Sequence, residues 1–229
     1  MPRTRAPISV IIPTLNAETV LPVALNALFE GLSAGLIRSL VVSDGGSRDR
    51  TLDIAEEAGA RIVTGAPSRG GQLCRGVAAA ADAEWLLVLH ADTVLPPRWS
   101  DEVDGVLDAP GAWYWRLRFD ADGMAPRAVA GWANLRSRLF NLPYGDQGLL
   151  IDRATYEAAG GYPDIPLMED VALARRLGRS LRPLQGVATT SAEKYRRQGW
   201  LRRGGRNLST LTGYLAGRDP ERLAARYRR

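Results

Sequence analysis

Cysteine, histidine and lysine each occur only once in this chain of 229 residues, as Cys74, His90 and Lys194. A single cysteine excludes an intrachain disulfide and a cysteine-rich zinc site, and a single histidine excludes any two-histidine metal motif. No lysine follows a glycine, which excludes a phosphate-binding loop that ends in Gly-Lys-Ser or Gly-Lys-Thr. Chemistry through a lysine Schiff base has one candidate residue, in an arginine-rich stretch.

Long hydrophobic runs are also missing. The longest, such as Trp85–Leu89, have the length of a strand, whereas a membrane-spanning helix needs about 20 apolar residues. The first seven residues carry two arginines, but the apolar run Ile8–Ile12 is too short for the core of a signal peptide. The expected location is therefore the cytoplasm.

Charge is unevenly distributed along the chain. The formal net charge is +5, yet residues 194–229 contain 11 basic and two acidic residues, a net +9, and leave −4 for the rest. We expect a catalytic domain over residues 1–193 and a basic, amphipathic helical extension over residues 194–229. A basic end favours an anionic partner such as nucleic acid, membrane headgroups or a phosphorylated ligand.

Strand and helix patterns alternate over the first 90 residues. Apolar, β-branched runs at Ile8–Ile12, Leu40–Val42, Arg61–Thr64 and Trp85–Leu89 predict strands, and the segments between them have helical spacing, with Asn16 and Ser47 as expected N-caps. This alternation predicts an α/β fold with a mostly parallel sheet. Ligands of such sheets bind beyond the carboxyl ends of the strands, where polar or glycine-rich segments follow each run.

Two aspartates follow strand ends in this pattern. Asp92 comes after the fourth strand and is held by Thr93 and two prolines, as a ligand of Mg²⁺ or Mn²⁺ would be, although it could instead cap the following turn. Asp44 precedes two glycines and could accept a hydrogen bond from a base or ribose, but Asp-Gly is also a common turn.

Other charged residues have two readings each. Arg69 is a candidate phosphate contact or a solvated loop residue, and His90 is a candidate ligand contact or a structural strand-end histidine. Glu169 and Asp170 stand at an expected helix N-terminus, where negative charge is favourable in any case. Adjacent carboxylates also raise each other's pKa, which suits one of them to act as a base.

Four segments together resemble family-2 glycosyltransferases. They are Val10–Asn16, Val42–Asp49, Leu89–Thr93 and Gly160–Asp170, in matching order over about residues 8–190. The chain is most similar to a small bacterial branch with a His-Ala-Asp tip and a Pro-Tyr-Gly-Asp-Gln segment, here residues 143–147. Members of that branch are described as associated with radical-SAM or selenium-related genes.

The resemblance implies a GT-A type of α/β fold and a metal-assisted, inverting transfer of a sugar from a UDP- or GDP-type donor to an acceptor hydroxyl. It implies that Asp44 contacts the base, that Asp92 holds Mn²⁺ or Mg²⁺ on the diphosphate, and that Asp170 is the base, beside Glu169. The remaining expected donor-site residues are Pro13, Thr14, Asn16, Glu18, Gly45, Arg69, Gln72 and His90. The expected residues on the acceptor side are Gly145, Asp146 and Gln147.

The sequence departs from the family pattern at three positions. His90 replaces the first carboxylate of the usual Asp-x-Asp metal motif, Ala172 stands where an aspartate is common, and Cys74 where an asparagine is common. An imidazole supplies less charge than a carboxylate, so the first departure bears on metal dependence.

The basic end has apolar residues at near-helical spacing. Trp200, Leu201, Leu208, Leu211, Tyr214 and Leu215 alternate with arginines, a pattern that fits a helix on an anionic membrane or a helix packed on the body. A membrane contact there would suit a lipid acceptor and a location at the inner face of the membrane.

Two other functions stay open. A sugar-phosphate nucleotidyltransferase usually has a glycine-rich loop after the first strand, where this chain has Pro13–Asn16. A non-catalytic module that binds nucleotides or nucleic acid would use the basic end, but the acidic body argues against nucleic acid, which we do not expect as a partner.

Overall fold

Eight strands form one sheet in residues 6–228, the part of the chain that this computed structural model describes. The strands are β1 (Ile8–Thr14), β2 (Ile37–Asp44), β3 (Arg61–Thr64), β4 (Trp85–Val88), β5 (Thr93–Val94), β6 (Ala112–Phe119), β7 (Leu149–Asp152) and β8 (Leu181–Thr190). Their order is β3-β2-β1-β4-β7-β6-β8-β5. The first four strands in this order are parallel, and so are β6 and β8, whereas β7 is antiparallel to β4 and β6. The predicted α/β fold with a mostly parallel sheet is thereby confirmed.

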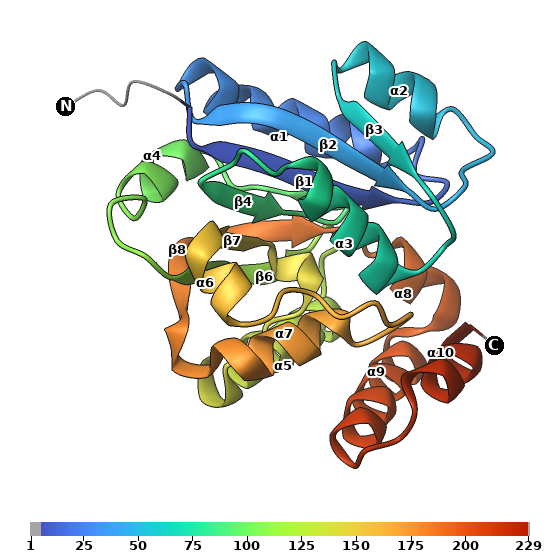
Figure 1. Cartoon of the computed structure of the whole chain (residues 1–229). Coiled ribbons are helices and arrows are strands. Elements are labelled where there is room, and N and C mark those ends of the chain that lie inside the picture. Colours follow the sequence, from blue (N-terminus) through green and yellow to red (C-terminus); the bar gives the residue numbers. More distant parts are fainter. Residues whose placement is uncertain (1–5, 229) are drawn as a thin grey trace.

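Helices cover both faces of this sheet (Figure 1). They are α1 (Leu21–Ser33), α2 (Thr51–Glu57), α3 (Arg69–Ala79), α4 (Trp99–Asp104), α5 (Met124–Phe140), α6 (Arg153–Ala158), α7 (Glu169–Leu177), α8 (Glu193–Gln198), α9 (Trp200–Leu215) and α10 (Pro220–Arg228). Among the described residues, no helix combines the length and apolar character that crossing a bilayer requires.

Alternation along β1 explains the two layers. Val10 and Ile12 point to one face and pack with residues of α1 and α4, including the fully buried Trp99. Ile11 points to the other face and packs with residues of α3 and α7. Because a strand turns successive side chains to opposite faces, a continuous apolar run is what a strand covered on both sides requires.

Both expected N-caps are wrong. Asn16 has a left-handed backbone (φ 49°), and α1 begins only at Leu21; the Asn16 side chain accepts a hydrogen bond from the Arg48 backbone instead. The Ser47 hydroxyl donates to Asp44, and α2 begins four residues later at Thr51. Tertiary hydrogen bonds between the loops after β1 and β2 thus take the groups that local capping would have used.

The C-terminal helices lie against the end of the sheet next to α5, coloured red in Figure 1. Tyr195 and Trp200 stack on each other, with ring centroids 4.7 Å apart, and both meet the edge of Phe119 from β6. The Asp120 side chain accepts from the Ala192 backbone N–H and forms an ion pair with Arg196, which fixes the start of α8. The predicted boundary at residue 193 falls beside this packed junction, and residues 1–5 and 229 of the two predicted segments lie outside the described residues.

Candidate active site

Two adjoining pockets open where the parallel strands end. The β1 pocket, of about 590 Å³, is lined by the loop after β1 and by residues of α3. The α7 pocket, of about 400 Å³, is lined by residues of α7, α8 and α9. Arg69, His90, Asp92 and Lys194 line both pockets and therefore stand where the two meet.

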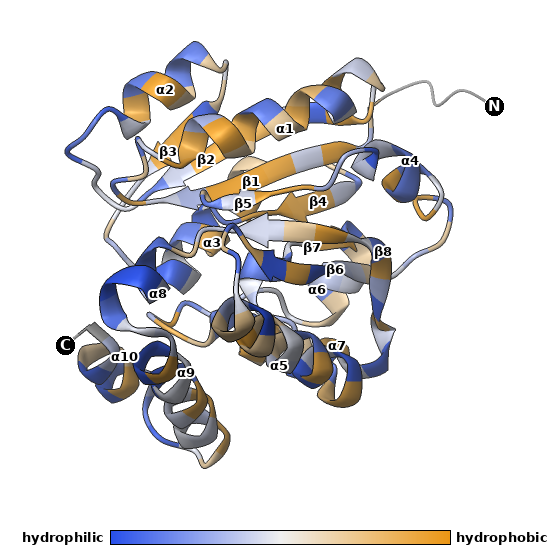
Figure 2. Ribbon diagram, turned by 180° about the vertical axis from the view of Figure 1, so that it is seen from behind, coloured by the Kyte–Doolittle hydropathy of each residue, from blue (hydrophilic) through white to orange (hydrophobic). Residues whose placement is uncertain are grey.

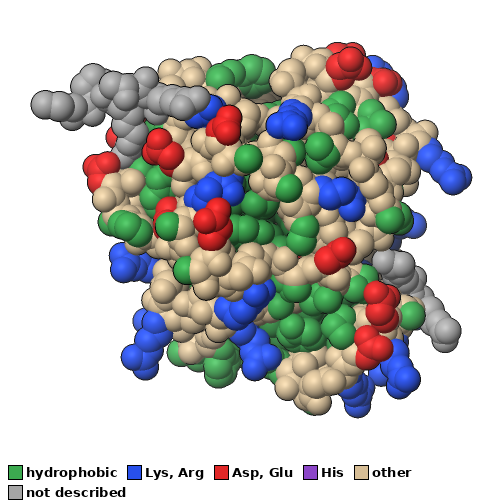
Figure 3. Space-filling view, viewed as in Figure 1, with side chains coloured by type: hydrophobic (Ala, Val, Ile, Leu, Met, Phe, Trp, Pro, Cys, Tyr) green, Lys and Arg blue, Asp and Glu red, His purple; other side chains and the backbone are tan. Residues whose placement is uncertain are grey.

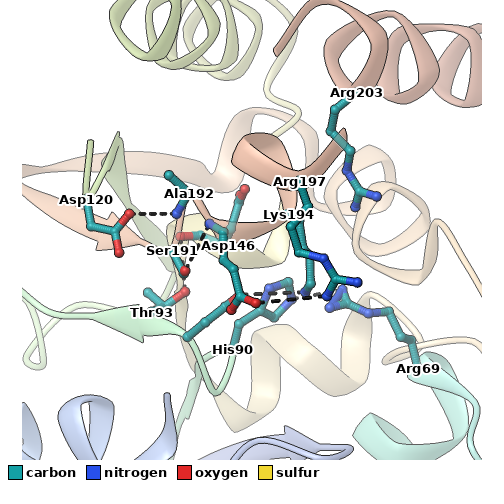
Figure 4. A network of polar contacts seen from close by, with 12 residues as sticks. Arg69, His90, Thr93, Asp120, Asp146, Ser191, Ala192, Lys194, Arg197 and Arg203 are labelled. Atoms are coloured by element: carbon teal, nitrogen blue, oxygen red, sulfur yellow. Dashed lines mark hydrogen bonds and ion pairs between the residues drawn. The ribbon is translucent and has the colours of Figure 1, made fainter. Parts of the chain in front are cut away.

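Arg69 and His90 form the floor of this junction. The Arg69 guanidinium lies 3.2 Å from His90 Nε2 (Figure 4). Because a guanidinium can only donate, Nε2 is the acceptor and the ring proton is on Nδ1. Burial, and then the positive charges of Arg69 and Lys194, lower the pKa of His90 well below its usual 6.5, so the ring is neutral.

Gly145 brings a second loop against this histidine. A Cβ at residue 145 would come closer than 3.0 Å to His90 Nε2, so only glycine allows this approach. The Gly145 N–H in turn donates to the Asp170 carboxylate at 2.9 Å. The predicted acceptor-side segment and the predicted base are therefore joined directly.

Asp170 is held by the backbone. Its Oδ2 accepts from Gly145 N–H and its Oδ1 from its neighbour's N–H, that of Val171, at 2.7 Å. Both bonds fix the orientation of this carboxylate at the first turn of α7. Asp170 lines the α7 pocket and is only partly buried, as a base that must reach a ligand has to be.

Glu169, beside it, has a different environment. The side chain is only 2% exposed, and its Oε2 has no hydrogen-bond partner within the described residues. Burial first, and then the charge of Asp170, raise the pKa of Glu169. Of the two adjacent carboxylates, Asp170 is thus the one whose two oxygens both accept backbone N–H groups and which is less deeply buried.

Asp146 is a further carboxyl on the wall of the α7 pocket. Its Oδ1 is buried without a hydrogen-bond partner among the described residues. Burial raises the pKa of Asp146 to about 6; Arg136 opposes the shift, and the negative charges of Asp170 and Asp92 add to it. The third residue of this segment, Gln147, lies in the core and bonds Ser137 and the backbone of Trp115, so it supports the loop from behind.

The predicted donor-site residues divide into two groups. Pro13, Thr14, Asn16 and Gln72 line the β1 pocket together with Arg69, His90 and Asp92. Glu18, Asp44 and Gly45 do not line it.

Asp44 is fully buried and shapes the loop after β2. Its carboxylate accepts from the Thr14 and Ser47 hydroxyls and from the backbone N–H groups of Gly46 and Ser47. Burial by itself would raise the pKa of Asp44, but these hydrogen bonds outweigh it and lower the pKa. A contact between Asp44 and a base stays a prediction.

Sequence reasoning missed the wall that the C-terminal helices build. Lys194 reaches the cleft and lies 3.7 Å from the Asp92 carboxylate, and Arg203, Asn207 and Tyr227 line the α7 pocket behind it. The Tyr227 hydroxyl donates to Asn207 and accepts from Arg203. The position of Lys194 shortly after β8 could have pointed to the cleft. The sequence pattern did not predict β8 as a strand, so this signal could not be used.

The residues of the junction suit a divalent metal ion whose remaining coordination positions are filled by a bound phosphate ligand and water. Asp92 is 19% exposed, and Asp146 lines the same pocket, with its Oδ1 buried and without a hydrogen-bond partner among the described residues. Across the described residues, no group of three or more His, Cys, Asp or Glu side chains is arranged to hold a metal ion. Mg²⁺ and Mn²⁺ are commonly held by one or two carboxylates, with phosphate oxygens and water as the remaining ligands, so this donor set suits a phosphate-bound ion.

Curated relatives of this chain include glycosyltransferases. A curated relative from Mycobacterium bovis (strain BCG / Pasteur 1173P2), "PGL/p-HBAD biosynthesis glycosyltransferase", is 39% identical over 94 residues, which is 38% of this chain and 36% of the relative. The aligned segment therefore spans about a third of that relative's length.

Solved structures share the fold. S. aureus TarS 1-349 superposes with a TM-score of 0.59 at 15% identity, over 90% of this chain and 64% of that one. Glucosyl-3-phosphoglycerate synthase from Mycobacterium tuberculosis, in complex with Mn²⁺ and UDP-glucose, superposes with a TM-score of 0.55 at 21% identity, over 81% of this chain and 70% of that one. The expected GT-A type of fold is confirmed by these neighbours.

The family described as "Glycosyl transferase family 2" matches residues 9–129. The match begins in β1, includes the loops that carry Asp44 and Asp92, and ends within α5. It covers just over half of the 229 residues. The resemblance expected from the four sequence segments is thereby confirmed, whereas the association with radical-SAM or selenium-related genes stays a prediction: the chain belongs to glycosyltransferase family 2.

Proposed function

We propose that this chain transfers a sugar from a nucleoside-diphosphate donor to an acceptor hydroxyl, with inversion at the anomeric carbon. The observation that carries the proposal is the Asp170 carboxylate, fixed by two backbone N–H groups in a pocket that also contains Asp92 and Arg69. A fixed base, a carboxylate open to the cleft and a cation at the junction are the groups that such a transfer needs.

The donor binds in the β1 pocket. Its volume of about 590 Å³ and its lining by Thr14, Asn16 and Gln72 suit a nucleoside, with the diphosphate at the junction. Asp44 supports this site by holding the loops after β1 and β2 together, through Thr14 and Ser47. The base is of the UDP or GDP type in this proposal, and Glu18 and Gly45 belong to the supporting loops.

The acceptor hydroxyl reaches the anomeric carbon from the side of Asp170. Asp170 takes the hydroxyl proton as the new bond from the acceptor oxygen to the anomeric carbon forms, and the bond from that carbon to the diphosphate oxygen breaks. Attack from the face opposite the leaving group inverts the anomeric configuration. Arg69 and Lys194 place positive charge beside the departing diphosphate.

Asp92 would hold a divalent metal, with Asp146 as a further carboxyl group of the same pocket. Bound there, Mn²⁺ or Mg²⁺ would neutralise charge on the leaving diphosphate. The presence of Mn²⁺ and UDP-glucose in the complexes of the M. tuberculosis synthase supports this assignment by analogy.

The C-terminal segment contributes in two ways. Residues 194–229 wall the acceptor side of the cleft through Lys194, Arg203 and Tyr227, and their positive charge suits contact with an anionic membrane surface. A lipid acceptor and a location at the inner face of the membrane follow from such a contact and are part of the proposal.

Thermal shift with nucleotides tests the donor half of the proposal. Ligands that bind only the folded chain raise its melting temperature, so one of UDP, GDP and CDP, with Mn²⁺ present, should give a clearly larger shift than the others. Asp92→Asn should reduce that shift, and Asp82→Asn, at an exposed aspartate ahead of β4, is the matched control. Equal or absent shifts for all nucleotides would contradict the proposed donor class.

A further inference from the structure

Large apolar side chains are exposed on two neighbouring helices. On α5, Trp132, Leu135 and Leu139 are 47%, 46% and 61% exposed, and on α9, Leu201, Leu208 and Leu215 are 90%, 45% and 45% exposed. We call these six side chains the α5–α9 face. Exposed apolar groups that gather in one patch mark a surface that binds something.

The spacing places each set on one side of its helix. Leu201, Leu208 and Leu215 recur every seven residues, and Trp132 and Leu139 are also seven apart, which corresponds to two helical turns. Trp132 and Leu208 both line the narrow groove between α5 and α9, so the two stripes adjoin. Figure 2 shows the two helices together at the bottom of the molecule, each striped with hydrophobic and hydrophilic residues.

Positive charge predominates on the two helices that carry this face. Arg127 and Arg138 are exposed on α5, and Arg202 is exposed on α9. Neither residues 124–140 nor residues 194–218 contain an aspartate or glutamate. Over the rest of the molecule in this view, acidic and basic side chains are interspersed (Figure 3).

The groove beneath this face leads toward the proposed base. The groove and the α7 pocket share five lining residues: Phe119, Tyr144, Asp146, Tyr195 and Asn207. The end of the groove away from the pocket is lined by apolar side chains of α5 and α9, including Val129 and Leu211. The groove itself is small, about 40 Å³, and the side chains that it shares with the α7 pocket are what separates the exposed face from the acceptor side of the cleft.

We propose that the α5–α9 face docks the enzyme on an anionic bilayer, and that an amphiphilic acceptor in this bilayer presents its hydroxyl to Asp170 from the side of the groove. Apolar side chains enter the acyl boundary while arginines bind anionic headgroups, and the two contributions add. The docking deepens the membrane contact of the proposed function and does not require the transfer reaction, whereas the second half rests on that reaction.

Co-sedimentation with vesicles tests the docking. The full chain should bind vesicles of phosphatidylglycerol mixed with phosphatidylcholine, bind pure phosphatidylcholine vesicles weakly, and lose binding as salt is raised. The double variant W132S/L139S should bind the anionic vesicles about tenfold more weakly or worse, because it removes two side chains that would enter the bilayer. L201S/L215S repeats the test on α9 and carries it if the first variant fails to fold.

The matched control lies on α1, on another side of the sheet. Phe29 and Leu32 are 60% and 55% exposed there, with Glu30 beside them, so they have the same exposure without the positive surroundings. F29S/L32S should bind vesicles like the unmodified chain. Equal losses in the α1 and α5 variants, or no salt-sensitive binding by the unmodified chain, would overturn the proposal.

Two further measurements separate other outcomes. If W132S/L139S alters the oligomeric state in sedimentation velocity and leaves vesicle binding unchanged, the face joins two copies of the chain and the proposal is wrong. Nucleotide-induced thermal shifts should be the same in W132S/L139S as in the unmodified chain. Their absence in both would contradict the proposed donor while the vesicle result still decided the docking.

Discussion

At the residue scale, the adjacent carboxylates of Glu169 and Asp170 have different environments. Asp170 receives two backbone N–H bonds, and Glu169 is buried with one oxygen unpartnered among the described residues. The same pair of residue types could do no more than stabilise the N-terminus of a helix by their negative charge. What separates the roles is that the loop of Gly145 reaches Asp170 and not Glu169.

Asp170→Asn should therefore lower the turnover number by about 10²- to 10⁴-fold, the contribution typical of a positioned general base. The fold should persist, because an amide oxygen can still accept the N–H of Gly145 or Val171. Turnover with the donor identified by thermal shift is the measurement. Asp164→Asn, at an exposed aspartate in the loop before α7, is the control, and equal activity of both variants would contradict the role of Asp170.

Asp146 gives a prediction on stability and pH. Its pKa is raised from 3.8 to about 6 in the folded chain, so the fold binds this proton more tightly than the unfolded chain does. The resulting stabilisation is complete below about pH 4 and is lost as the pH rises through about 6. Asp146→Asn, which never ionises, should gain melting temperature relative to the unmodified chain between about pH 4 and about pH 7. A difference that stays constant over this range would show that Asp146 is not shifted.

At the scale of elements, the start of α3 is set by a close approach to the loop before α7. The Gly70 N–H donates to Ile165 O at 3.0 Å, and a Cβ at residue 70 would come closer than 3.0 Å to the backbone of Pro163 and Ile165. This contact holds Arg69 and Asp170 on neighbouring walls of one pocket. Helix position and site geometry are thus fixed by the same glycine.

Gly70→Ala should lower the free energy of unfolding by about 1–3 kcal/mol, as overpacking against rigid backbone does. Gly71→Ala is the matched control on the next residue of the helix. Its Cβ would meet the ends of the movable side chains of Asp164 and Arg75, and Ser68 Cβ only at 3.3 Å, so its loss should be clearly smaller than that of Gly70→Ala. Denaturant unfolding of both variants measures the difference, and similar losses at the two positions would refute the close approach.

At the scale of the whole molecule, the acidic body and the basic C-terminal end of the chain line opposite sides of one cleft. The acidic body supplies Asp92, Asp146 and Asp170, and the basic end brings Lys194 and Arg203 to the same pocket. Figure 4 shows Asp146 together with these two basic residues. Lys194 lies at the carboxylate that would hold the metal. A metal ion at that carboxylate therefore depends on a phosphate ligand to complete its coordination.

A chelator should for this reason leave the melting temperature of the ligand-free chain unchanged. The described residues offer no site of three or more metal-binding side chains, so no metal is expected to support the fold. The same chelator should remove most of the melting-temperature shift that the preferred nucleotide produces with Mn²⁺. A large loss of stability without nucleotide would point instead to a structural metal.

The sequence by itself determined that helices cover both faces of the sheet and that polar residues follow the ends of its parallel strands. Apolar runs such as Ile8–Ile12 and Trp85–Leu89 can be satisfied only by strands covered on both faces, and parallel strands bring the residues that follow them to one edge. Asp92, Arg69 and His90 were found in this way. The residues also singled out Glu169 and Asp170, and the family resemblance chose Asp170 of the two as the expected base.

Tertiary structure decided what depends on contacts between distant residues. The strand β8 has arginine, proline and glycine among its residues and no clean alternation, and it forms because it pairs with β6. Asn16 and Ser47 bond across loops rather than cap their own helices. Lys194 enters the cleft because Asp120 and the ring cluster around Phe119 fix α8 there, and local pattern carries no information about such packing.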